Sequence, residues 1–395
     1  MTELYCTDHL HRARFLERPN RFIVIADHDG EPRRTYVANP GKLQEILLTG
    51  PTELWLAHKP HTKTKWECVG ATWTERWPGD KPRAVFLNTG QVNDVAHAYL
   101  NRGLVPGLED ATVIKREHTV GDSRFDFLMD TPRGELLLEV KSVTLVEEGM
   151  ALFPDARSKR ATRHVEELTE LAREGRQTAV LFMVQGDARS FLPDLHNDLD
   201  FARALRRAAA DVQLFAIAVP PSLDGGRLSF PQNPTPLNIP FERLDPILDD
   251  GGLYLVVLEI DAPTTTTIGA LGSFDFQPGF YTYIGSAKKG LTKRMARHKR
   301  KRKRVHWHID YLRNVAGKVR SFAIRGARDE SALADEVAQL GHRFPPGFGA
   351  TDCDDDGHLV FTETDPVSTP EFQNLLTRWR HRRVFAHAEA DADLV

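Results

Sequence analysis

Two carboxylates and one lysine, Asp126, Glu139 and Lys141, are spaced so that a hairpin would bring them together. Residues 131–134 include a proline and a glycine, which favour a turn. A four-residue hairpin loop there would set Asp126 opposite Glu139. Because side chains alternate along a strand, Glu139 and Lys141 would point to the same face as Asp126. Carboxylate oxygens suit Mg²⁺ or Mn²⁺, and an adjacent ammonium can orient or deprotonate the water that attacks a phosphodiester. The pattern therefore predicts a metal-dependent nuclease site with Asp126 and Glu139 as metal ligands.

The alternative interpretation of these charges is a solvated, salt-bridged sheet face. An exposed ion pair of that kind contributes only about 0 to 1 kcal/mol to stability. The apolar residues around the motif instead favour a strand covered on both sides, where a charge needs a partner such as a metal ion. These apolar residues are Phe125, Phe127, 136–138, Val140 and Val143.

The secondary structure that must position these groups is predicted to change from mainly β in residues 1–80 to mixed α/β in residues 81–230. In residues 1–80, several short β-like runs separated by polar turns predict a small barrel. In residues 81–230, strand and helix patterns alternate after the hairpin, which predicts a sheet flanked by helices. The expected barrel strands are 21–26, 35–38, 53–58, 65–73 and 84–87, and the later elements are a helix through 165–172, a strand at 179–184, a helix at 201–210 and a strand at 212–219.

The sequences of the motif segments resemble those of the sugar fermentation stimulation protein family, and the resemblance covers residues 1 to about 235. The segments are Gly121–Phe127, Glu139–Leu145 and Phe153–Ala156, with Asn39–Leu43, Asn88, Thr89 and Asn93 upstream. The resemblance implies an OB-like barrel at 1–80, a PD-(D/E)XK nuclease-like α/β domain at 81–230, and DNA binding.

A cluster of basic residues could hold phosphate beside the predicted metal site. It begins a predicted helix, whose N-terminus carries partial positive charge. An ordinary polar helix face remains the alternative. The candidate nucleic-acid contacts in this part of the chain are Arg124, Arg160, Arg163 and His164.

The remaining chain divides into a proline-rich linker at 231–250, a domain at 251–365 and a C-terminal helix and tail at 366–395. Gly252-Leu253-Tyr254, Tyr283-Ile284-Gly285 and the segment 306–312 resemble an uncharacterised branch of the GIY-YIG nuclease superfamily. The resemblance implies a small α/β domain in which Tyr254 and Tyr283 flank the attacking water. It also implies that Arg294 stabilises phosphate charge and that Glu330 holds a divalent metal.

Between Lys288 and Arg304 the chain has eleven Lys or Arg residues and no acid. Such a run is either a solvated charged face or a surface for a polyanion, which would release counterions on binding. The candidate nucleic-acid contacts here are Lys293, Arg297, His298 and Arg300.

Four further residues, His306, His308, Cys353 and His358, are of types that bind zinc. The related branch has a second cysteine where this chain has Asp355, and a hard oxygen in place of a soft sulfur disfavours structural zinc. Histidines that line a polar cleft or touch phosphate are therefore the favoured interpretation.

Composition is consistent with a cytoplasmic protein of two or three domains. The 395 residues are 41% hydrophobic and 27% charged, without an apolar stretch of membrane-spanning length or a signal-peptide core. Three distant cysteines argue against a disulfide framework. A net charge of -3 means that nucleic acid, expected to be DNA, must bind through local patches. A non-catalytic DNA-binding regulator of sugar metabolism and a scaffold for acidic proteins are the alternatives to a nuclease.

Overall fold

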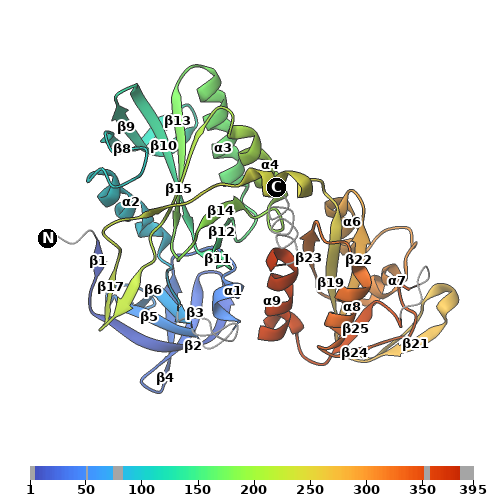
Figure 1. Cartoon of the computed structure of the whole chain (residues 1–395). Helices are drawn as coiled ribbons and strands as arrows, with labels where there is room; N and C mark the ends of the chain where they lie inside the picture. The colour runs from blue at the N-terminus through green and yellow to red at the C-terminus, as the bar shows by residue number, and fades with distance from the viewer. Residues whose placement is uncertain (1–4, 50–51, 74–82, 351–355, 383–395) are drawn as a thin grey trace. The chain divides into compact units, whose positions relative to one another are not determined.

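The computed structural model describes residues 5–49, 52–73, 83–350 and 356–382. The chain forms two compact units, residues 1–241 (unit 1) and 242–395 (unit 2), which are described separately (Figure 1). The mixed α/β and β multidomain fold confirms the predicted class. None of the helices in the described part of the chain is long and apolar enough to cross a membrane.

Unit 1 begins with a closed OB-like barrel, as predicted. Its closure comes from the pairing of β4 with β6, in which Tyr36 lies opposite Glu67 and Val37 opposite Cys68. The first barrel strand was not expected, because its sequence is largely charged and lacks regular apolar alternation. The barrel elements are β2 (Leu10–Asn20), β3 (Ile23–His28), β4 (Glu31–Val37), α1 (Gln44–Leu47), β5 (Thr52–His58), β6 (Trp66–Trp73) and β7 (Arg83–Phe86).

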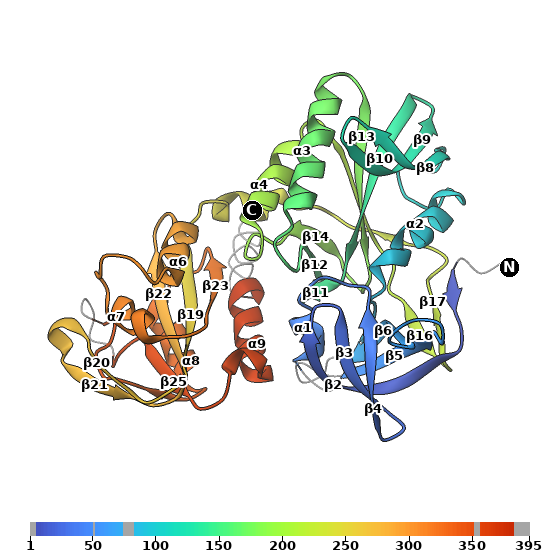
Figure 2. The ribbon, with the colours of Figure 1, turned by 180° about the vertical axis from the view of Figure 1, so that it is seen from behind.

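The second part of unit 1 is a six-stranded mixed sheet in the order β18-β15-β13-β10-β9-β8. Strands β10, β13 and β15 are parallel, and β9 and β8 continue the sheet antiparallel. Figures 1 and 2 show α3 and α4 side by side along this sheet. The bounds are β8 (Thr112–Val120), β9 (Ser123–Thr131), β10 (Gly134–Val143), β13 (Gln177–Val184), β15 (Gln213–Ala218) and β18 (Thr235–Pro236), with α2 (Val92–Leu100), α3 (Lys159–Arg173) and α4 (Leu199–Ala208).

The hairpin of β9 and β10 has the predicted register. Asp130 lies opposite Glu135, and the pairing continues to Phe127 opposite Leu138. Thr131 also pairs with Gly134, so the loop is two residues shorter than expected. Asp126 follows directly on the last pair, which brings its side chain to the backbone of β10.

Two apolar cores hold the sheet, one on each face. Val165 and Leu168 of α3 pack with Phe125 and Phe182, whereas Tyr99 of α2 belongs to the core on the other face. Barrel residues Leu10, Trp55 and Phe86 share that second core with Phe127 and Leu138 of the sheet. The barrel and the sheet are therefore parts of one packed body.

Short strands complete unit 1. The proline-rich segment is partly pinned to the sheet, since the Leu237 N–H donates to Ala216 O at 2.9 Å and β18 pairs with β15. The short elements are β1 (Cys6–Thr7), β16 (Ser222–Asp224) and β17 (Arg227–Ser229), which pair together, and β11 (Leu145–Glu147), β12 (Met150–Phe153) and β14 (Ser190–Pro193).

Unit 2 is a small α/β domain built on a five-stranded sheet in the order β23-β19-β22-β25-β24. Leu291, Ile309 and Leu312 pack on one face of this sheet, and Leu333, Phe372 and Trp379 pack on the other. The strands are β19 (Gly252–Ile260), β20 (Thr264–Thr267), β21 (Ser273–Phe276), β22 (Gly279–Ala287), β23 (Val319–Arg325), β24 (His342–Arg343) and β25 (Leu359–Thr362), and the helices are α5 (Phe241–Leu244), α6 (Leu291–Lys299), α7 (His308–Val315), α8 (Glu330–Ala338) and α9 (Pro370–Thr377).

Candidate active site

Asp126, Glu139 and Lys141 line one cavity of about 670 Å³ in unit 1. Its walls come from the hairpin of β9 and β10, from the start of α3, and from the barrel loop at residues 39–42. The hairpin register explains the grouping, because it places the two acids across adjacent strands with the lysine two residues further along.

Asp126 is fixed by two hydrogen bonds to its carboxylate. Asn93 Nδ2 donates to Oδ1 and the Val140 N–H donates to Oδ2, both at 2.7 Å. Burial and the nearby charge of Glu139 raise the pKa of Asp126, and the bonds from Val140 and Asn93 together with Lys141 offset part of that increase. A cation between the two acids would relieve their repulsion.

Glu139 is 2% exposed, yet its pKa is lowered. Burial alone would raise that pKa, but a hydrogen bond from His164 and the charge of Lys141 outweigh it. His164 Nδ1 lies 2.6 Å from Glu139 Oε1, and Lys141 Nζ contacts the same oxygen. The other oxygen, Oε2, is buried and has no hydrogen-bond partner among the described residues. An open carboxylate oxygen beside Asp126 is a suitable donor set for Mg²⁺ or Mn²⁺.

His164 has a different role from the expected nucleic-acid contact. It is buried, donates through Nδ1 to Glu139, and accepts at Nε2 from Arg160 Nε at 3.4 Å. His164 is therefore a positioning residue that orients Glu139. The helical spacing of His164 with the buried Ala161, Val165 and Leu168 is the sequence signal that would have indicated an inward side chain.

The barrel wall of the cavity contributes the loop that begins at Asn39. Asn39 Oδ1 accepts the Gly41 N–H at 2.9 Å, which bends the loop toward the sheet. Gly41 has no side chain for a structural reason, because a Cβ there would overlap the carboxylate of Asp155. Asp155 lines the same cavity, and its Oδ2 is buried without a hydrogen-bond partner among the described residues. Asp155 was quoted in the motif but was not expected to belong to the site.

Asp155 makes the stability of unit 1 depend on pH. Burial, with Glu45 and Asp194 nearby, raises its pKa from 3.8 to about 7, although Lys42 and Arg18 act in the opposite direction. Between pH 3.8 and about pH 7, Asp155 keeps its proton in the folded chain but has lost it in the unfolded chain. The free energy of unfolding therefore falls as pH rises through this window toward about 7. We expect a loss of at most about 1.4 kcal/mol per pH unit in this window.

The measurement is hydrogen exchange of unit 1 amides in urea at about pH 5 and about pH 8. Asp155→Asn, which resembles the neutral carboxyl, is expected to remove most of the pH dependence. An equal pH slope in Asp155→Asn and in the unmodified chain would contradict the assignment.

Two other candidates of unit 1, Arg124 and Arg163, do not line this cavity. Arg124 pairs with Glu117 at 3.4 Å, and both side chains are exposed. Arg163 is also exposed and pairs with Glu167 at 3.5 Å. Arg160, in contrast, lines the cavity.

In unit 2, Tyr254 and Tyr283 lie on adjacent strands with ring centroids 6.3 Å apart. Tyr254 Oη lies 3.0 Å from His298 Nε2, so His298 is buried behind the tyrosine and is not available as a surface contact for nucleic acid. Burial, followed by the charge of Lys303, lowers the pKa of His298 to about 4. Gly285 is needed opposite Tyr254, because a Cβ there would overlap the phenol ring.

Arg294 and Glu330 act on the same tyrosines. Burial raises the pKa of Tyr254, the positive charge of Arg294 lowers it, and the negative charge of Glu330 raises it. Arg294 lies over the Trp307 ring at 4.8 Å, and Glu330 Oε1 lies 3.1 Å from His358 Nδ1. Tyr254 and Tyr283 are therefore neighbours, and the charges of Arg294 and Glu330 act on both phenols.

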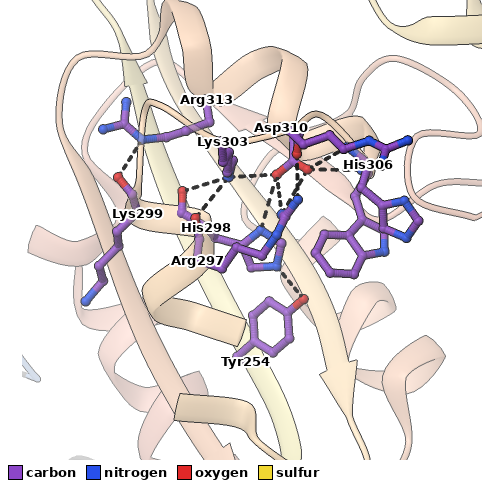
Figure 3. A network of polar contacts seen from close by, with 10 residues as sticks. Tyr254, Arg297, His298, Lys299, Lys303, His306, Asp310 and Arg313 are labelled. Carbon is purple, nitrogen blue, oxygen red and sulfur yellow. Dashed lines mark hydrogen bonds and ion pairs between the residues drawn. The ribbon is translucent and has the colours of Figure 1, made fainter. Parts of the chain in front are cut away.

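A buried acid, Asp310, pairs with some of the cations in the basic run at 288–304 (Figure 3). Asp310 is 0% exposed and accepts from Arg297 at 2.9 and 3.0 Å, from Lys303 at 2.7 Å and from the His306 N–H at 3.0 Å. Arg297, expected to contact nucleic acid, is thus paired with a buried acid and only partly exposed. The exposed cations of the run are Lys288, Lys289, Lys293, Lys299, Arg300, Lys301, Arg302 and Arg304.

The described histidines among the zinc candidates have separate partners. His308 Nδ1 accepts the Gly349 N–H at 3.0 Å, His358 faces Glu330, and His306 packs on Trp307. Cys353 and Asp355 lie outside the described residues. Within the described ranges, no three His, Cys, Asp or Glu side chains are grouped as metal ligands.

Comparisons with known proteins assign each region. Residues 16–78 match the SfsA N-terminal OB domain, residues 90–225 the sugar fermentation stimulation protein RE domain, and residues 253–381 the domain of unknown function DUF123. The sugar fermentation stimulation protein homolog of Methanothermobacter thermautotrophicus is 39% identical over 199 residues, which is 50% of this chain and 80% of the relative. The homolog of Clostridium acetobutylicum is 38% identical over 215 residues, 52% of this chain and 90% of the relative.

The solved structure of Pyrococcus furiosus SfsA in complex with Ca²⁺ is similar in fold. It is 27% identical, has a TM-score of 0.53, and covers 60% of this chain and 99% of its own.

Proposed function

Because this chain belongs to the sugar fermentation stimulation protein family, we propose that unit 1 binds nucleic acid and hydrolyses its phosphodiester bonds with the help of Mg²⁺ or Mn²⁺. The observation that carries the proposal is the convergence of Asp126, Glu139 and Lys141 in one cavity, with an open Glu139 oxygen. The Ca²⁺ in the Pyrococcus furiosus relative supports divalent metal binding by this group of proteins.

Asp126 and Glu139 would hold the metal, which when bound supplies a positive charge that stabilises the phosphate in the transition state. Asn93 and the Val140 amide orient Asp126, and His164 orients Glu139. Lys141 donates a hydrogen bond toward the reacting water and holds its charge close to the developing negative phosphate oxygens. Burial of the acids keeps bulk water out and strengthens these electrostatic contributions.

The test is cleavage of labelled DNA and RNA by the full chain with Mg²⁺ or Mn²⁺, compared with the Asp126→Asn variant. Cleavage is expected to fall by about 1,000-fold, while nucleic-acid binding is retained, because the variant removes one metal ligand and no surface cation. Asp130→Asn is the matched control, since Asp130 lies on the same strand and is exposed. Absence of cleavage and of calorimetrically detected Mg²⁺ or Mn²⁺ binding in the unmodified chain would refute the nuclease assignment.

We propose a second phosphodiester site in unit 2, formed by Tyr254, Tyr283, Arg294 and Glu330. The convergence of these residues supports it, with Glu330 as the residue that would hold a divalent metal. Lys293 and Arg300, both exposed, would contact the nucleic-acid backbone. Residual cleavage by Asp126→Asn that disappears when Arg294→Ala is added would support this site. Unchanged residual cleavage in the double variant would count against it.

A further inference from the structure

The carboxylates of unit 1 lie on the inside of a cavity and not on an open surface. Glu139 is 2% exposed, and the side chain of Lys141 is 12% exposed. A cavity of about 670 Å³ falls in the range of roughly 300 to 1,000 Å³ that holds a small ligand. One or two nucleotides fit that volume, whereas a base-paired duplex does not.

The two walls of this cavity are held at a fixed separation. The barrel and the sheet share one apolar core, so they cannot move apart without exposing it. The barrel loop is also braced from behind. Arg18 Nη2 donates to Asn39 O at 3.1 Å and to Arg21 O at 2.7 Å, and Arg18 Nη1 contacts Lys42 O.

The lining has the mixed chemistry of a nucleotide. Arg21 and Lys42 on the barrel face Arg160 on the start of α3, and these cations suit backbone phosphates. Two apolar residues that also line the cavity, Leu152 and Phe153, suit a sugar or an unpaired base. The cavity therefore offers contacts to all three parts of a nucleotide.

Three polar atoms in the lining point to a missing polar ligand. Glu139 Oε2, Ser142 Oγ and Asp155 Oδ2 are all buried, and none has a hydrogen-bond partner among the described residues. Buried polar groups are rarely left without a hydrogen-bond partner, because burial removes their bonds to water and nothing replaces them. A metal ion bound by Glu139 would give Oε2 a partner. Ser142 Oγ and Asp155 Oδ2 would then be free to contact the substrate.

We propose that this cavity accepts an unpaired polynucleotide strand, threaded between the barrel loop and α3, and excludes intact duplex. The inference rests on the proposed function of unit 1 and specifies its substrate. A duplex would have to open locally to bring a phosphate to Asp126 and Glu139, and the loss of base pairing and stacking opposes that opening.

The test measures binding and cleavage of three substrates of one sequence by the full chain: a single strand, a blunt duplex, and the same duplex with a single-stranded overhang. At constant salt, the single strand is expected to bind to the Asp126→Asn chain at least about tenfold more tightly than the blunt duplex. Arg21→Ala is expected to reduce that preference. Arg34→Ala, an exposed arginine elsewhere on the barrel, is the matched control and should leave it unchanged.

The cleavage arm separates this inference from the proposed function. If the unmodified chain cuts blunt duplex as fast as single strand, and Asp126→Asn abolishes both, the nuclease assignment stands and the single-strand inference is wrong. Equal affinity for both forms, with Arg21→Ala affecting both alike, also overturns it. Preference for the single strand without any metal-dependent cleavage would support the binding mode and refute the nuclease.

Discussion

Glu139→Gln is expected to abolish tight Mg²⁺ or Mn²⁺ binding and to lower cleavage by about 1,000-fold. Glu139 contributes a buried carboxylate oxygen next to Asp126 that has no hydrogen-bond partner among the described residues, and it is also the counterion of Lys141. Glutamine has the same size as glutamate, and its oxygen can still accept the hydrogen bond from His164. It lacks the negative charge that balances both a metal ion and the ammonium group of Lys141. Calorimetric metal titration and single-turnover cleavage measure the two effects.

Glu135→Gln is the matched control for this variant. Glu135 lies on the same strand, opposite Asp130, and is exposed. It should bind metal and cleave like the unmodified chain. If Glu139→Gln retained both metal affinity and cleavage, the metal site would have to lie elsewhere.

Asp310→Asn is expected to destabilise unit 2 by about 3 to 5 kcal/mol. The carboxylate is fully buried and balances Arg297 and Lys303, so its neutralisation leaves two partly buried cations without a counterion. Burial would raise the pKa of Asp310, but the hydrogen bonds from Lys303, the Trp307 amide and Arg297 hold it below its ordinary value. Its contribution to stability is consequently lost only when pH falls through that lowered pKa.

Hydrogen exchange in increasing urea measures this change separately in each unit. Amides of α6 and α7 should lose protection, whereas those of unit 1 should not change. Asp335→Asn provides the comparison, since that acid is exposed and pairs with Arg343 at the surface of the same unit. A similar loss of amide protection in both variants would mean that the buried Asp310 stabilises unit 2 no more than an exposed acid does.

The local pattern predicted much of the site in unit 1. Turn residues at 131–134 and strand alternation were enough to set the register that groups Asp126, Glu139 and Lys141. Both signals depend on neighbours within about ten residues, and so they can be read without the tertiary fold. The strand Leu10–Asn20 was missed for the converse reason, because its charged sequence becomes a strand only through its partners in the barrel.

Residue types gave no means of separating cations that are free at the surface from cations that are paired with a buried acid. Arg297 and Arg300 occur in the same basic run, yet Arg297 is bound to Asp310 and Arg300 is exposed. His164 is likewise turned inward to Glu139, although it belongs to a helix start rich in basic residues. In each case the partner lies 13 or more residues away in the chain.

Chemical identity and local spacing thus define a hairpin that carries two acids and a lysine, because turn geometry and side-chain alternation act over short distances. The cavity exists only once the barrel loop at Gly41 meets Asp155 and the shared core sets the distance between the walls. Those contacts join segments that are far apart in sequence, and their geometry follows from packing the whole unit.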